Sequence, residues 1–188
     1  EKDTHQAMEA LVHNLCNLSS RAGGQVPFSS VNFGTDISEE GRMVSKNLML
    51  SMYEGLGNGE TAIFPIAIMK LKKGVTDKGS PNYDLFQLSC KVSAKRLYPN
   101  WVNESATFNA QYYKEVHPET EVATMGCRTR VIGNIYDPDN QVTPGRGNLF
   151  PTTISLPYIA LEAKRNSKCD TNSKELIKEF YNVLDKRM

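Results

Sequence analysis

The sequence lacks the features that define several common classes of protein. No apolar run approaches the roughly 20 residues that a transmembrane helix needs, so we expect no membrane association. The 188 residues carry a formal net charge of only +1. Without an excess of basic residues there is no bulk attraction to nucleic acid or to anionic lipid, and any phosphate binding must be local.

Cysteine is scarce, and no two cysteines are close together in the sequence. Cys16, Cys90, Cys127 and Cys169 form no CxxC pair, which argues against a zinc site and against a dense disulfide framework. The first residues also lack the basic-then-apolar order of a signal peptide. We therefore expect a cytoplasmic protein with reduced thiols and no metal site in this chain.

The composition, 39% hydrophobic and 23% charged, is typical of a globular domain. Helical periodicity predicts helices over residues 7–18, 38–52, 83–97 and 173–184, the second capped by Asp36 or Ser38. Strand-forming residues predict strands over 25–34, 63–71, 107–113 and 152–156. This alternation indicates βαβ units and a largely parallel sheet. Because the chain begins inside a predicted helix and without methionine, we expect it to be a fragment of a longer protein.

One cysteine lies in a setting that suits thiol chemistry. Cys127 follows Gly126 and is flanked by Arg128 and Arg130, and nearby positive charge favours the reactive thiolate. The alternative is a small, half-buried cysteine at a strand end. A cysteine-nucleophile enzyme would also need a histidine base, for which His117 is the only nearby candidate. Cys16 and Cys90 fall inside predicted helices, where we expect them to be packing residues.

Four blocks of the sequence carry a resemblance to a known family. They are Ser20–Asp36, Gly55–Thr61, His117–Arg130, which contains Thr124-Met125-Gly126-Cys127-Arg128, and Gly145–Asn148. In this order, the blocks resemble the anaerobic (class III) ribonucleoside-triphosphate reductases, and the resemblance thins after about Ala163. The glycine run in the second block only superficially resembles a phosphate loop, because it follows a helix and has no GK[ST]; we interpret it as a turn.

The resemblance implies an α/β fold, namely part of a ten-stranded α/β barrel with a finger loop through its centre. Residues 1–188 would form a fragment of one catalytic barrel domain, with the finger loop at 117–133 and a C-terminal helix at 170–188. The family's N-terminal ATP-binding domain and its C-terminal glycyl-radical and zinc region would lie outside the chain.

The resemblance also implies roles for particular residues. Cys127 matches the finger-loop cysteine that becomes a transient thiyl radical and abstracts the 3′-hydrogen of the ribonucleotide. Asn148 matches the asparagine that hydrogen-bonds the ribose hydroxyls, a task that suits an uncharged donor and acceptor. Met125 matches a position proposed to help form a formate site, or it is a flexible residue that fills a gap. No cofactor is expected within the chain.

The remaining candidate residues are polar groups near this loop. Ser29, Ser30 and Asn32 are candidates for lining the barrel and contacting substrate. Arg128 and Arg130 either pair with Glu119 or Glu121, or face the substrate's phosphates.

The implied partners are ribonucleoside triphosphate substrates, dNTP and ATP effectors, formate, and a radical-SAM 4Fe–4S activase that installs the glycyl radical. A second copy in a homodimer is also implied. The family's second active-site cysteine would lie before Glu1, so we expect the isolated fragment to be inactive. The alternative function is a nucleotide-effector-binding or dimerisation module, or a degenerate paralogue without catalysis.

Overall fold

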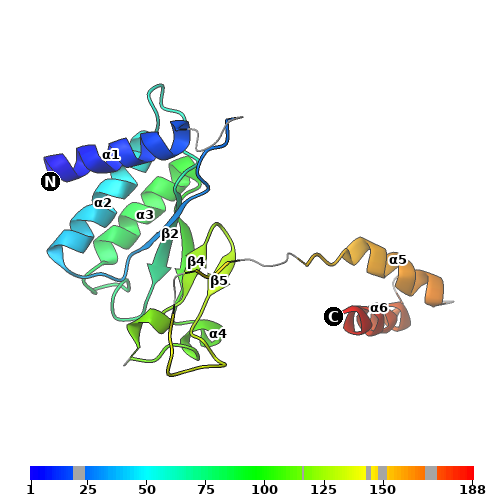
Figure 1. The fold of residues 1–188 in the computed structure, drawn as a ribbon. Helices are drawn as coiled ribbons and strands as arrows, with labels where there is room; N and C mark the ends of the chain where they lie inside the picture. The colour runs from blue at the N-terminus through cyan, green and yellow to red at the C-terminus, as the bar shows by residue number, and fades with distance from the viewer. Residues whose placement is uncertain (19–23, 116, 143–144, 148–151, 168–172) are drawn as a thin grey trace. The chain divides into compact units, whose positions relative to one another are not determined.

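The computed structural model describes residues 1–18, 24–115, 117–142, 145–147, 152–167 and 173–188. The chain divides into two units, Glu1–Gly147 and Asn148–Met188, which are described separately (Figure 1).

Three long helices belong to the first unit. They are α1 (Lys2–Asn17), α2 (Glu39–Glu54) and α3 (Tyr83–Arg96), so the first three predicted helices are confirmed. Ser38 is the N-cap of α2, and its side chain accepts a hydrogen bond from the Gly41 backbone N–H. Asp36 supports this cap by accepting a hydrogen bond from the Ser38 N–H at 2.8 Å.

The first unit is built on a three-stranded parallel sheet. β1 (Ser30–Phe33), β2 (Ile66–Leu71) and β3 (Asn100–Asn103) lie in that order, with β2 in the centre. Ser30 pairs with Ile66, and Ile68 pairs with Asn100. Because α2 connects β1 to β2 and α3 connects β2 to β3, the unit contains two successive βαβ crossovers, as the sequence predicted.

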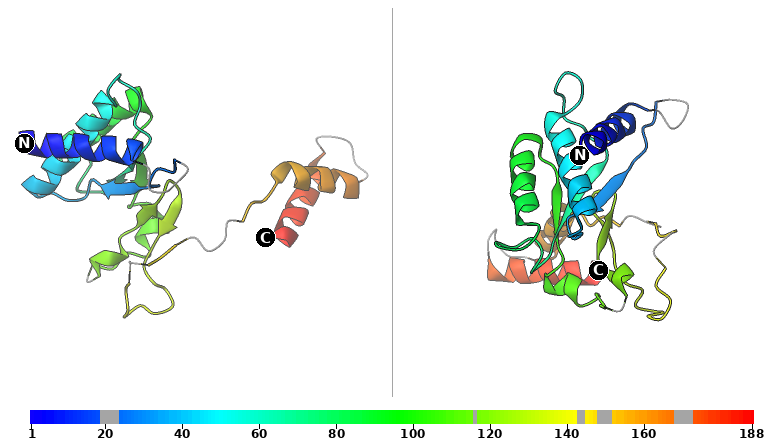
Figure 2. Two further views of the ribbon diagram at one scale, coloured as in Figure 1. Left: turned by 45° about the horizontal axis from the view of Figure 1, so that its top comes forward. Right: turned by 90° about the vertical axis from the view of Figure 1, so that its left-hand side faces the viewer.

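The two faces of the sheet have different coverings. Ala67 and Met69 of β2 point to the helical face, where they form one core with residues such as Leu48 of α2 and Val92 of α3. Since side chains alternate along a strand, Ile68 and Lys70 point to the opposite face. Figures 1 and 2 show α1, α2 and α3 on one side of the strands and a small hairpin, β4–β5, on the other.

A buried arginine fixes the connection between α2 and β2. The Arg96 guanidinium donates hydrogen bonds to the carbonyls of Tyr53, Glu54 and Gly59, at 3.0, 2.7 and 2.7 Å. Gly55 begins this connection with φ +83°, a conformation that favours glycine. The glycine run is therefore a turn at the end of a helix, as predicted.

Two predicted strands are wrong. Residues 107–113 form no strand: they begin with a single helical turn, α4 (Thr107–Ala110), in which the Asn109 side chain donates to the Asn103 carbonyl at 2.7 Å. Residues 152–155 have no regular structure, and Ser155 instead caps the helix α5 (Leu156–Asn166). The sequence analysis predicted neither β3, which has only four residues, nor α5.

The second unit is a pair of helices, α5 and α6 (Lys174–Arg187). Their contact is a small apolar core of Ile159, Ala163 and Val183, closed by an ion pair between Glu162 and Arg187 at 3.0 Å. Helix α6 confirms the predicted C-terminal helix and is capped by Ser173. Within the described part of the chain, none of the helices has the length and apolarity that crossing a membrane requires.

The cysteines differ in their surroundings. Cys16 packs partly buried against the core, and its thiol lies 3.1 Å from the Phe64 carbonyl, so its predicted packing role is confirmed. Cys90 is exposed on α3, so the prediction of packing is wrong there. It lies on the solvent side because Ser89 and Val92 take the buried positions of that turn. Cys169 lies outside the described residues.

Candidate active site

Cys127 lies at the tip of an antiparallel hairpin. The hairpin consists of β4 (Ala123–Met125) and β5 (Thr129–Val131), with Met125 paired to Thr129 across a three-residue turn. A single 3₁₀ turn, η1 (Pro118–Thr120), precedes it. The Cys127 side chain is exposed, so the structure favours an accessible thiol over a packed one.

Two polar side chains of β1 attach the hairpin to the sheet. The Asn32 amide donates to the Thr124 carbonyl and accepts from the Thr124 N–H, both at 2.8 Å. The Ser30 hydroxyl accepts a hydrogen bond from the Gly126 N–H at 3.1 Å. These contacts satisfy backbone groups of the hairpin and place its tip against the non-helical face of the sheet.

Gly126 is required by the geometry of the turn. Its φ is +62°, in the left-handed region, and an added Cβ would lie 3.0 Å from Cε1 of Phe28. A side chain here would therefore strain the backbone and crowd an aromatic ring at once. Glycine at this position avoids both problems and lets the backbone just before Cys127 lie close to the Phe28 ring.

The thiol lies on a cleft of about 350 Å³ between the hairpin and the sheet. Ile68, Asn100 and Val102 contribute the wall from the strands, and Cys127 and Arg128 contribute the wall from the hairpin. Phe108, Asn109 and Arg130 also line the cleft. The cleft thus combines a thiol, amide groups and positive charge, a set that suits a polar, anionic ligand.

The two arginines beside the thiol behave differently. Arg130 donates to the Asn109 side chain at 2.8 Å and to the Phe108 carbonyl at 3.3 Å, and its guanidinium lies over the Phe108 ring. Among the described residues, the Arg128 side chain makes no hydrogen bond or ion pair. The predicted option that either arginine pairs with Glu119 or Glu121 is wrong, because Glu121 pairs with Lys70 and Lys72, and Glu119 contacts the His117 ring instead.

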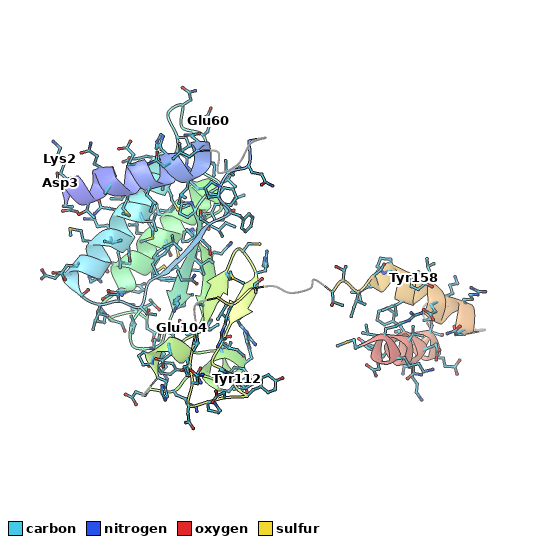
Figure 3. The ribbon with its side chains drawn as sticks, viewed as in Figure 1. Lys2, Asp3, Glu60, Glu104, Tyr112 and Tyr158 are labelled. Carbon is cyan, nitrogen blue, oxygen red and sulfur yellow. The ribbon has the colours of Figure 1, made fainter. Side chains whose placement is uncertain are left out.

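Buried charges hold the base of the hairpin. Lys70 Nζ lies 2.8 Å from Glu121 Oε2 and 3.2 Å from Glu104 Oε1, and Lys72 Nζ lies 3.1 Å from Glu121 Oε1. The side chains of Lys70 and Glu104 are 10% and 7% exposed. Glu104 follows β3 and is labelled in Figure 3.

The two carboxyls of this cluster titrate in opposite directions. Burial, together with the neighbouring Glu121, raises the pKa of Glu104 to about 7. Burial alone would also raise the pKa of Glu121, but hydrogen bonds from Glu104, Lys70 and Lys72, with the charge of Lys70, outweigh it and lower that pKa to about 2. Near neutral pH the pair therefore holds its charge on Glu121.

Other predicted residues lie around the hairpin. Met125 is half-buried on β4. Ser29 has a buried hydroxyl that makes no hydrogen bond within the described residues. The His117 ring lies 2.9 Å from Glu119 and is not part of the cleft that Cys127 lines. Asn148 lies outside the described residues; shortly before it, Arg146 donates to the Ile132 and Val142 carbonyls.

Sequence reasoning missed Lys70, Glu104 and Asn109. Lys70 is a charged residue inside an apolar run of a central strand, which is a detectable anomaly because charges are rarely buried without a partner. Glu104 and Asn109 gave no such signal. No group of three His, Cys, Asp or Glu side chains able to hold a metal ion occurs among the described residues.

Comparison with known proteins gives a consistent result. A family model described as anaerobic ribonucleoside-triphosphate reductase matches residues 1–188. The enzymes of that name from Haemophilus influenzae and Escherichia coli are each 32% identical over the whole chain, and that of Enterobacteria phage T4 is 36% identical over 87% of it. The chain spans about a quarter of the length of these relatives, 24%, 24% and 26%.

Proposed function

Because the chain belongs to the anaerobic ribonucleoside-triphosphate reductase family, we propose that the protein reduces ribonucleoside triphosphates to 2′-deoxyribonucleoside triphosphates. The observation that carries this proposal is the position of Cys127. Its thiol is exposed at the tip of a hairpin that hydrogen bonds attach to β1, on a cleft that also presents amides and a guanidinium.

We propose that the chain is part of a ten-stranded α/β barrel, with residues 117–133 as its finger loop. The arrangement of layers supports this. All three parallel strands carry their helices on one face, as the wall of a barrel does, and the hairpin lies on the other face, where a barrel has its interior. A hairpin mounted on that face by Asn32 and Ser30 would project its tip into the centre of the closed barrel.

In the proposed reaction, Cys127 acts as a thiyl radical toward the ribose. The sulfur takes a hydrogen atom from C3′, so the S–H bond forms as the C–H bond breaks and the unpaired electron passes to C3′. The radical arises through a glycyl radical in another part of the protein, installed by a radical-SAM activase, and formate supplies the reducing electrons. As the family resemblance implies, we assign the glycyl radical and the structural zinc to other segments of the protein.

The neighbouring residues then take roles that fit their contacts. We propose that Arg128, which lines the cleft and is unpaired among the described residues, binds the substrate's phosphates, since a guanidinium matches phosphate geometry. Ser30 and Asn32 act by holding the hairpin, because their polar atoms are engaged there. Ser29, Met125 and Asn148 remain candidates for contacting ribose or formate. We further propose a cytoplasmic homodimer that is regulated by dNTP and ATP effectors.

The test uses the full-length protein that contains this chain, with its activase and formate under anaerobic conditions. Cys127→Ser should abolish nucleotide reduction and leave the glycyl-radical EPR signal intact, because the radical is installed elsewhere. Cys90→Ser is the matched control, since Cys90 is also an exposed thiol but lies on α3, and it should keep full activity. Retained activity in the Cys127 variant contradicts the assignment and favours a binding-only module.

A further inference from the structure

The charged cluster at the base of the hairpin joins three segments that are distant in sequence. Lys70 lies on β2, Glu104 follows β3, and Glu121 immediately precedes the buried Val122 and β4. Thr35, after β1, also approaches Glu121, with its hydroxyl 3.5 Å from Oε2. The cluster therefore ties the start of the hairpin to all three strands of the sheet.

Stability alone does not explain these charges. A buried ion pair loses in desolvation much of what it gains in attraction, and well-packed apolar residues of similar size often stabilise a fold as well or better. Lys70 shares its face of β2 with Ile66 and Ile68, so an apolar residue is compatible with that surface. A charged pair differs from apolar packing because each charge selects a residue of opposite charge as its partner.

The hairpin needs such specificity at β1, because its attachments there do not depend on which hairpin residues they hold. Asn32 and Ser30 bond only to backbone atoms of Thr124 and Gly126. If β4 slipped by two residues, similar backbone bonds would form again with the same faces presented. That slip would carry the tip by about 7 Å, at 3.4 Å per residue, and remove the thiol from its position on the cleft.

We propose that Lys70 and Glu121 are positioning residues that set the register of the hairpin and so the place of Cys127, with Glu104 as a competing partner for Lys70. Glu121 is suited to this because it accepts from two lysines, through both carboxylate oxygens. For the reaction this inference rests on the proposed function; for the geometry of the hairpin it does not.

Glu104 makes the attachment sensitive to pH. The groups that face the two carboxyls are Lys70, Lys72, Lys73 and Tyr113, which border the cluster or the small cavity of about 200 Å³ beside it. Because the pKa of Glu104 is about 7, Glu104 is protonated and neutral at lower pH. Glu121 is then the charged partner of Lys70. Its ionised form competes for Lys70 at higher pH. Glu104→Gln should therefore remove the change in the hairpin's attachment that occurs near pH 7.

The experiment compares Glu121→Gln with Glu119→Gln in the full-length protein. Glu119 is the matched control, since it lies two residues away and, within the described ranges, pairs with His117 alone in an exposed position. Hydrogen exchange over residues 122–131, followed by mass spectrometry, should become at least tenfold faster in the Glu121 variant and stay within twofold in the control. Unchanged exchange in the Glu121 variant overturns the proposal.

Lys70 gives a second test should the Glu121 variant fail to fold. Lys70→Arg keeps the charge and should exchange within threefold of the wild type, whereas Lys70→Met should exchange at least tenfold faster. Equal rates in the two variants overturn the proposal.

Turnover separates this inference from the proposed function. Glu121→Gln should lower kcat at least tenfold and leave KM within twofold, because the substrate cleft remains while the thiol moves. If Cys127→Ser is inactive and Glu121→Gln matches the wild type in exchange and kcat, only the positioning role fails. If the wild type shows no reduction, the proposed function fails and the exchange rates still decide the positioning role.

Discussion

Arg96 offers the sharpest test of how the fold is held together. It is 8% exposed, and its guanidinium donates to three carbonyls and, at 3.3 Å, to the Thr61 hydroxyl. Two of these carbonyls, of Tyr53 and Glu54, belong to the last turn of α2, which has no helical donors for them. We therefore expect Arg96→Met to free the end of α2 and the turn that follows.

The magnitude follows from the contacts. Hydrogen bonds from a charged donor contribute about 1.5–3 kcal/mol each. The sum is reduced, because the freed carbonyls near the surface regain water and because burying the guanidinium was itself unfavourable. Three carbonyls lose such a bond, and after this reduction we expect the free energy of unfolding to fall by about 3–4 kcal/mol.

Two measurements check this expectation. Urea-induced unfolding followed by circular dichroism gives the change in free energy, and limited proteolysis reports whether the segment from Gly55 to Thr61 opens. Arg165→Met is the control, since Arg165 is exposed on α5, and it should change stability by less than about 0.5 kcal/mol. A loss below about 1 kcal/mol for the Arg96 variant, with the segment still resistant, would refute the reasoning.

Three further predictions concern the hairpin. Gly126→Ala should lower the free energy of unfolding by about 1–2 kcal/mol in urea titrations, because φ is +62° and the new Cβ meets Phe28; no loss would contradict the turn geometry. Asn32→Ala should speed the hydrogen exchange of the Thr124 amide at least tenfold, since that amide loses its 2.8 Å acceptor, and unchanged exchange would contradict the attachment. The pKa of Glu121 is lowered to about 2 on folding, so its stabilisation is present above its ordinary value of 4.5 and is lost as pH falls toward 2. Acid titration should therefore show a shallower loss of stability in Glu121→Gln, and identical profiles would contradict this.

The elements that the sequence predicted well are those with a strong pattern of their own. Helices α1, α2 and α3 have apolar residues at helical spacing, and β2 is an apolar run that is buried on both faces of the sheet. Local chemistry marked their ends too, as with the Ser38 cap. These features depend on residues that are neighbours in sequence, so the sequence alone was sufficient.

The errors occur where distant contacts decide the structure. Strand β3 has only four residues, with an asparagine at each end, and it forms because β2 provides an edge with which it pairs. The segment from Thr107 has strand-forming residues, yet it takes a helical turn that Asn109 fixes by bonding to the Asn103 carbonyl. The charged cluster brings together Lys70, Glu104 and Glu121, which no local pattern connects.

The candidate site was predicted in part for the same reason. The accessible thiol of Cys127 and the glycine before it belong to one short block, so they could be recognised together. The hydrogen bonds between Asn32 and Thr124 could not be predicted from the sequence, because 92 residues separate the two. Resemblance to a family identified the block, whereas only the structure shows how it is mounted.

The order of the strands has a consequence for how the protein is made. Within the described residues, β1 and β3 each pair with β2 alone, so each has an outer edge whose backbone groups can accept another strand. Unpaired strand edges of this kind are prone to aggregation while a chain is being synthesised. We expect this part of the protein to depend on chaperones during synthesis, and the isolated segment to self-associate as its concentration rises.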